Sequence, residues 1–264
     1  MNTLEPVLLK ELNEADYESL IRFRIRKILM ICSNYDAFIL EEDGQIESQI
    51  YREYIDLNLS NPPKFVWVTT SEEARRVLQE SPDIDMIISM FNMGDKDVFT
   101  LASELKHSGR NIPFVLLTHF SKEIYRRLSM QDTSGIDYMF SWHGNADLIV
   151  AIIKLFEDRI NADHDITEVG VQAILLVEDS VRYYSTYLPE LYKLVLKQSA
   201  EFLKETLNEQ QRKYMKRSRP KILLATNLDD AMTMYEKYKS NLLGVISDVG
   251  FCEHRGGKPE EEKL

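Results

Sequence analysis

Ile174-Leu175-Leu176-Val177-Glu178-Asp179-Ser180 decides the fold of this chain when it is read together with Val245-Ile246-Ser247-Asp248. Each stretch is a short apolar run that ends in an acidic residue. A run of this length between polar residues is typical of a strand buried on both faces of a parallel sheet. Because ligands of such sheets bind just beyond the carboxyl ends of the strands, we expect Glu178, Asp179 and Asp248 to meet at one edge.

Three carboxylates at one sheet edge repel one another unless a cation lies between them. Mg²⁺ suits an all-oxygen site in which it keeps several waters, so the pattern predicts a weak magnesium site. Asp248 could then attack phosphorus as a nucleophile and form an aspartyl phosphate. The alternative is that Glu178-Asp179-Ser180 only caps a helix and that Asp248 is a turn residue.

An internal repeat indicates that the chain holds two such sheets. Ile28-Leu29-Met30-Ile31 resembles the run over 174–177, and Ile87-Ile88-Ser89-Met90 resembles the run over 245–248. A repeat longer than about 100 residues indicates tandem domains. We therefore expect four segments: a helical lead-in over 1–25, a first unit over 26–160, a polar linker over 161–172 and a second unit over 173–264.

Alternating strand and helix signals fill the first unit. The expected strands cover 27–32, 65–69, 86–90, 113–118 and 136–140. The expected helices cover 36–57, a segment that starts with Ser71 as its cap, 98–107, 121–130 and 146–160. Five strand–helix pairs in this order predict an α/β fold with a parallel sheet.

The acid pair after one strand and the acid that ends a later strand resemble the receiver domain of bacterial response regulators. The resemblance implies a flavodoxin-like fold in tandem, with the second unit incomplete. It also implies that Asp248 is the phosphoacceptor, that Glu178, Asp179 and Asp248 hold Mg²⁺, and that the carbonyl of Gly250 is a further ligand. The expected partner is a histidine kinase or another phosphodonor.

The first unit lacks the residues that this chemistry needs. Cys32 and Ser33 stand where the acid pair would be, and Met90 stands at the phosphoacceptor position. The lysine that receivers carry after the fifth strand falls at about Ser141. Only Thr118 matches the receiver pattern, so we expect a pseudo-receiver that is kept for its surface.

The second unit differs from a receiver at two places. The elements that follow the third strand of a receiver are not in the sequence, so we expect a fragment whose missing C-terminal domains belong to a longer protein. A long helical stretch, 181–216, carries an apolar stripe, and we expect it to project and to form a dimer with a second copy. The stripe consists of Tyr184, Tyr187, Leu188, Leu191, Leu194, Val195, Phe202, Leu203 and Leu207. The expected dimer seam within it consists of Tyr184, Leu188, Leu191, Val195 and Phe202.

The basic cluster 212–219 that follows this stretch indicates a solvent-exposed helix end.

Two runs, 35–44 and 175–185, resemble the N-terminal region of large bacterial proteins of the phosphoenolpyruvate synthase or pyruvate phosphate dikinase type. That resemblance implies a regulatory or docking region for such an enzyme, and no downstream phosphotransfer residue is present to imply dikinase activity.

Composition limits the remaining classes of function. The net charge of −11 over 264 residues argues against a nucleic-acid partner, and no apolar run approaches the roughly 20 residues that span a membrane. Cys32 and Cys252 are far apart, which favours a reducing, cytoplasmic location. A purely structural dimerisation module is the alternative to a regulatory receiver, and neither alternative is an enzyme.

Overall fold

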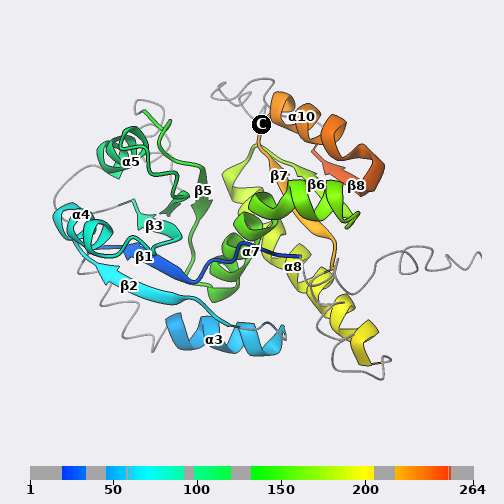
Figure 1. Ribbon diagram of the computed structural model, residues 1–264, viewed down its shortest axis with the longest axis horizontal. Coiled ribbons are helices and arrows are strands. Elements are labelled where there is room, and N and C mark those ends of the chain that lie inside the picture. Colours follow the sequence, from blue (N-terminus) through cyan, green and yellow to red (C-terminus); the bar gives the residue numbers. More distant parts are fainter. Residues whose placement is uncertain are drawn as a thin grey trace, which may run out of the picture. The chain divides into compact units, whose positions relative to one another are not determined.

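The structure is a computed structural model that describes residues 20–33, 46–57, 59, 61–91, 98–119, 132–204, 218–248 and 250, without the side chains of 200–204. The chain forms an α/β fold with two parallel sheets (Figure 1). The described residues divide into two compact units. The five-stranded unit takes them from Ile25–Phe156 and Ser180–Tyr192, and the three-stranded unit takes the others.

The sheet of the five-stranded unit has the order β2-β1-β3-β4-β5, and every neighbouring pair is parallel. This is the strand order of a flavodoxin-like fold. Its residues at β3 and β4 are buried throughout, as a parallel sheet covered on both faces requires. The strands are β1 (Lys27–Ile31), β2 (Lys64–Val68), β3 (Met86–Met90), β4 (Phe114–Thr118) and β5 (Tyr138–Ser141).

Helices cover this sheet through apolar residues at helical spacing. Ala74 and Leu78 of α4 (Ser71–Glu80) and Leu101 of α5 (Val98–His107) pack in one cluster with Leu29 and Ile87 of the sheet. Two further helices meet each other, because the ammonium of Lys154 lies 5.2 Å from the ring centre of Tyr54. They are α3 (Ile46–Asp56) and α7 (Ala146–Ala162), whose last part belongs to the three-stranded unit.

The sheet of the three-stranded unit has the order β7-β6-β8 and is also parallel. Its strands are β6 (Ala173–Val177), β7 (Lys221–Ala225) and β8 (Leu242–Ser247). The register of β8 against β6 shifts between Ala173 and Ile174, so that Leu242 faces the first and Gly244 the second. Two helical segments pack against this sheet, the π-helix η1 (Asp163–Glu168) and α10 (Leu228–Tyr238). The 3-10 helix η2 (Lys239–Asn241) precedes β8.

Most of the predicted elements are confirmed, with shifts at their ends. The cap expected at Ser71 is wrong, because Thr70 caps α4 and its hydroxyl accepts the Glu73 N–H at 3.1 Å. The segment predicted as a polar linker contains the end of α7 and η1. The helix predicted over 121–130 and the lead-in before Leu20 lie outside the described residues, as does Cys252. None of the helices in the described part of the chain is both long and apolar enough to cross a bilayer.

Part of the apolar stripe that the sequence predicted on the long helix α8 (Val181–Lys204) is buried within the chain, whereas Tyr187 and Leu194 of that stripe are exposed. The first turns of the helix belong to the five-stranded unit. There the Tyr184 ring meets the Phe140 ring edge-on, with centres 5.4 Å apart, and Leu188 is fully buried. Val195, further along the stripe, is buried as well. The predicted dimer seam over 181–216 is therefore wrong for these residues, because their side chains already pack inside the chain; residues 205–217 lie outside the described part.

Candidate functional site

The carboxyl edge of the three-stranded sheet brings together the acidic residues that follow β6 and β8. Val177 and Ser247 are register partners, and the Asp248 N–H donates to the Val177 carbonyl at 3.2 Å. The Glu178 N–H donates to the carbonyl of Ala225 at 3.0 Å on the other side. These backbone contacts place Glu178 and Asp248 at neighbouring strand ends, as the sequence predicted for a parallel sheet.

The acidic side chains at this edge differ in exposure. Glu178 is 3% exposed, Asp179 is half-buried, and Asp248 and Gly250 are exposed. Among the described residues, no three Asp, Glu, His or Cys side chains lie close enough together to hold one metal ion. The donor set fits Mg²⁺ in chemical type, since one or two carboxylates with several waters suffice for this ion. The side chains as they lie do not form a closed cage.

The matching edge of the five-stranded sheet is buried and uncharged at the predicted positions. The thiol of Cys32 is fully buried. Met90, Thr118 and Ser141 are each less than one-tenth exposed. None of these four positions carries an anionic side chain.

Helix α8 covers the end of β5 on this sheet. The Ser141 N–H donates to the Ser185 hydroxyl at 2.9 Å, and the Tyr184 hydroxyl donates to the carbonyl of Met139. The Ser185 acceptor and the Tyr184 donor come from the first turn and a half of α8, which starts two residues after Asp179 in the sequence. The first turns of α8 therefore hold the edge strand β5 within the five-stranded unit, a contact that no local sequence pattern shows.

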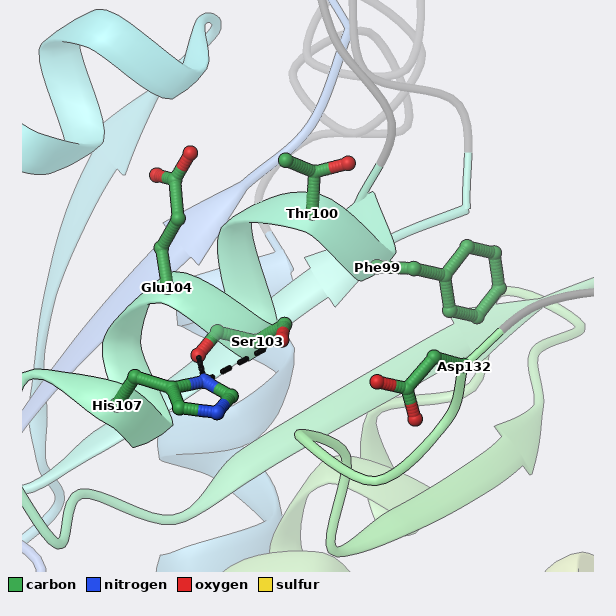
Figure 2. Close-up of a pocket in the computed structure, with 6 residues that line it drawn as sticks. All are labelled: Phe99, Thr100, Ser103, Glu104, His107 and Asp132. Carbon is green, nitrogen blue, oxygen red and sulfur yellow. Dashed lines mark hydrogen bonds between the residues drawn. The ribbon is translucent and has the colours of Figure 1, made fainter.

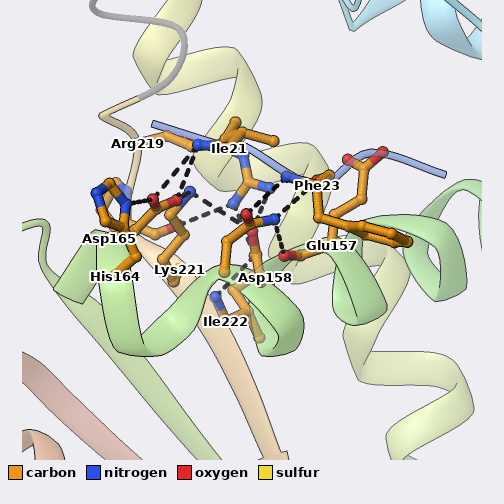
Figure 3. Close-up of polar contacts among 11 residues, drawn as sticks. Ile21, Phe23, Glu157, Asp158, His164, Asp165, Arg219, Lys221 and Ile222 are labelled. Carbon is orange, nitrogen blue, oxygen red and sulfur yellow. Dashed lines mark hydrogen bonds and ion pairs between the residues drawn. The ribbon is translucent and has the colours of Figure 1, made fainter. Parts of the chain in front are cut away.

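A cluster of four buried charges lies in the three-stranded unit, and sequence reasoning missed it (Figure 3). Arg219 binds Asp158 through two N–H···O bonds of 2.8 and 2.7 Å. The Lys221 ammonium lies 2.7 Å from an Asp165 oxygen and 4.0 Å from Asp158. All four side chains are at most 3% exposed. Burial lowers the pKa of Lys221, and the nearby Asp158 and Asp165 carboxylates oppose this shift.

This cluster also holds the segment that precedes β1. The Ile21 N–H lies 3.3 Å from both oxygens of Asp165, and Asn161 exchanges two hydrogen bonds with the Phe23 backbone, at 2.9 and 2.8 Å. Ile21 has φ +52°, a conformation that β-branched residues rarely adopt. The predicted solvated basic end is wrong at Arg219, which is buried; 212–217 lie outside the described residues. The cluster is a structural anchor without access for a substrate.

A hollow of about 420 Å³ on α5 gathers a serine, a histidine and two acids (Figure 2). His107 Nδ1 lies 2.7 Å from the backbone carbonyl of Ser103 and 3.4 Å from its hydroxyl. Because a carbonyl only accepts, Nδ1 carries the proton and is occupied by its own helix. Asp132 instead accepts the Ser134 N–H, the main cause of its lowered pKa. A nucleophilic triad needs the acid on one ring nitrogen and the serine on the other, and this hollow has neither arrangement.

Comparison with known proteins leaves the family open. No protein-family model matches the chain, and no curated protein matches it. The resemblance of 35–44 and 175–185 to enzymes that use phosphoenolpyruvate therefore stays a prediction.

Solved receiver domains are among the similar structures. One is the signal receiver domain of a protein described as a LuxO repressor from Vibrio parahaemolyticus, with a TM-score of 0.40 and 17% identity over 55% of this chain and 98% of that one. Another is the signal receiver domain of an HD domain-containing protein from Pseudomonas fluorescens Pf-5, with a TM-score of 0.36 and 20% identity over 53% and 97%. The case for a function of this chain rests on its own residues.

Proposed function

We propose that the chain is a signal-receiving regulatory module of a phosphorelay in which Asp248 accepts a phosphoryl group. The observation that carries the proposal is the register of β6 and β8. It places the acid pair Glu178-Asp179 and the exposed Asp248 at neighbouring strand ends of a parallel sheet. Ligands of open parallel sheets bind at this edge.

The exposure of the three acids suggests their roles. Asp248 is exposed, so that one of its carboxylate oxygens can reach the phosphorus of a phosphohistidine or of a small acyl phosphate. The new O–P bond forms as the bond from phosphorus to the donor breaks, and the donor keeps the electron pair. Glu178 and Asp179 would hold Mg²⁺, with the Gly250 carbonyl as a further ligand. When bound, the ion would neutralise charge on the phosphoryl oxygens.

In this proposal the five-stranded unit is a pseudo-receiver, a receiver-like domain that is not itself phosphorylated. Its equivalent positions, Cys32, Met90 and Ser141, are buried and carry no carboxylate, so they offer neither an acidic ligand for an ion nor an aspartate that could accept a phosphoryl group. Met139 and Ser141 of this unit bind the first turns of α8, which suggests that the unit serves to hold this helix. A purely structural docking role for the whole chain is the competing function, and it requires that Asp248 is never phosphorylated.

Treatment with acetyl phosphate and Mg²⁺ tests the proposal. Intact-mass spectrometry should show one added phosphoryl group on the wild-type chain, and none on Asp248→Asn. Asp229→Asn is the matched control, because Asp229 is an exposed aspartate of the same unit and its variant should still be labelled. Equal labelling of wild type and Asp248→Asn would refute Asp248 as the phosphoacceptor.

The metal ligands need a separate measurement. Titration with Mg²⁺ alone, followed by amide NMR shifts near Asp248, should give weak saturable binding that Asp179→Asn abolishes. Gly250→Ala should bind like the wild type, because its backbone carbonyl is kept and an added Cβ meets no atom within 4 Å. A wild-type response that Asp179→Asn leaves unchanged would exclude the acid pair as the ion site.

A further inference from the structure

Strand β8 is exposed along nearly its whole length, unlike the strand to which it corresponds in the other sheet. Leu243, Val245 and Ile246 are 51%, 48% and 44% exposed. In the internal repeat Val245-Ile246-Ser247-Asp248 matches Ile87-Ile88-Ser89-Met90, which lies in β3, and every residue of β3 is buried. The difference arises because β3 lies between β1 and β4, whereas β8 has only β6 beside it among the described strands.

The free edge of β8 presents backbone groups that can pair with another strand. The Asp248 N–H points to β6, where it donates to Val177. Along a strand, backbone groups point alternately to one side and the other, so Ile246 and Gly244 also face β6. The N–H and C=O groups of Val245 and Ser247 therefore face outward, where no described strand pairs with them.

Beta-sheet proteins usually protect such an edge with charged residues, proline or a covering segment. Leu242-Leu243-Gly244-Val245-Ile246-Ser247 has no charge and no proline. The register irregularity lies at its beginning and leaves the pairing after Gly244 regular. The apolar side chains on both faces of β8 would also lose exposure if the sheet continued past this strand.

Charge at the two ends of β8 favours a second copy as the occupant. Lys239, 56% exposed and paired with the similarly exposed Glu236 at 2.5 Å, precedes the strand, and the exposed Asp248 follows it. A two-fold axis perpendicular to the sheet makes two β8 strands antiparallel, which brings the Lys239 end of each copy toward the Asp248 end of the other. The middle of the contact is uncharged, so it adds no repulsion between two chains that each carry a net charge of −11.

We propose that β8 pairs in antiparallel fashion with β8 of a second copy, so that two three-stranded sheets form one continuous sheet. This dimer forms without phosphorylation of Asp248. It also differs from the helix-stripe dimer predicted from the sequence, because Tyr184, Leu188 and Val195 are buried within the chain while β8 is open.

Light scattering on the full chain at tens of micromolar tests the proposal. The wild type should have the mass of a dimer, and Val245→Lys should have the mass of a monomer, because a symmetric pairing would bring two new lysines close together. Met232→Lys is the matched control: Met232 is 50% exposed and apolar in the same unit but lies on α10, and its variant should stay dimeric. Far-UV circular dichroism should show that both variants are folded.

Hydrogen exchange gives a second, independent measurement. The amides of Val245 and Ser247 should exchange more slowly in concentrated than in dilute wild-type protein, while those of Val245→Lys should not change with concentration. A wild-type monomer, with or without protected amides at these positions, would overturn the proposal, and so would a dimer that Val245→Lys leaves intact. Larger open aggregates of the wild type would also contradict a closed two-fold pairing.

Discussion

The buried charge cluster allows a sharp test of the packing in the three-stranded unit. Lys221→Met replaces a fully buried lysine by an apolar side chain of similar length, and it leaves Asp165 without the ammonium 2.7 Å away. At this distance the attraction is about 6 kcal/mol with an effective dielectric constant of about 20. Desolvation of the two ions costs a similar amount, so the pair itself contributes little net stability.

Loss of only one partner is different, because Asp165 then stays buried without its ammonium and keeps, among the described residues, only the Ile21 N–H and the His164 ring nitrogen as partners. We expect Lys221→Met to lower the free energy of unfolding by about 3–5 kcal/mol. The double variant Lys221→Met with Asp165→Asn should recover most of this loss, because the Asn carbonyl oxygen can still accept from Ile21. Lys237→Met is the matched control: Lys237 pairs with Asp163 at 2.5 Å, but the two side chains are 49% and 68% exposed, so the cost should be at most about 1 kcal/mol.

Chemical denaturation with two probes measures these changes. Far-UV circular dichroism reports on both units, whereas the only two tryptophans, Trp67 and Trp142, lie in the five-stranded unit. Lys221→Met should move the circular dichroism transition to lower denaturant by more than it moves tryptophan fluorescence. A single variant as stable as Lys237→Met, or a double variant less stable than the single one, would refute the inference that an uncompensated buried charge causes the loss.

Four smaller changes follow from individual contacts. Gly135→Ala should lower the melting temperature by several degrees, because an added Cβ would lie 2.5 Å from the backbone carbonyl carbon of Ala102 and overpacking costs about 1–3 kcal/mol. Asn227→Ala should cost about 1 kcal/mol in denaturant unfolding, because it removes the side chain that caps α10. Tyr184→Phe should cost about 1 kcal/mol in the same assay through the lost hydrogen bond to β5. Peptide mass spectrometry after acetyl phosphate treatment should find no phosphoryl group on residues 26–160, and one found there would contradict the pseudo-receiver proposal.

Local sequence patterns predicted the elements of the fold well because each strand and helix has its own period of apolar residues. The β3 strand and α5 were predicted at the ends that the structure has, 86–90 and 98–107. The placement of the acids followed from the rule that parallel strands end at the same edge. The pattern did not distinguish Thr70 from Ser71 as the helix cap, because it does not fix the first residue of a helix to within one position.

The contacts that the sequence did not predict join residues far apart in the chain. Arg219 and Asp158 are 61 positions apart, and each alone is typical of a solvated helix surface. The stripe on α8 did predict an apolar contact, but a stripe does not say which surface covers it. For Tyr184 of the stripe, the covering surface is β5 of the same chain.

The proposed phosphoacceptor and the proposed pairing edge lie on consecutive residues, which links the two proposals. Phosphorylation would add a charge of about −1.5 to −2 at Asp248. In the antiparallel pairing this charge approaches the Lys239 end of the partner copy, so it should strengthen the dimer, and the gain should shrink with added salt because both groups are exposed. Coupling of this kind is reciprocal: a phosphorylated chain should dimerise more tightly than an unphosphorylated one, and Lys239→Gln should remove the difference. Dimer dissociation constants, obtained by dilution with and without acetyl phosphate, measure this effect. Equal constants for the phosphorylated and unphosphorylated wild type would show that phosphorylation does not affect dimerisation.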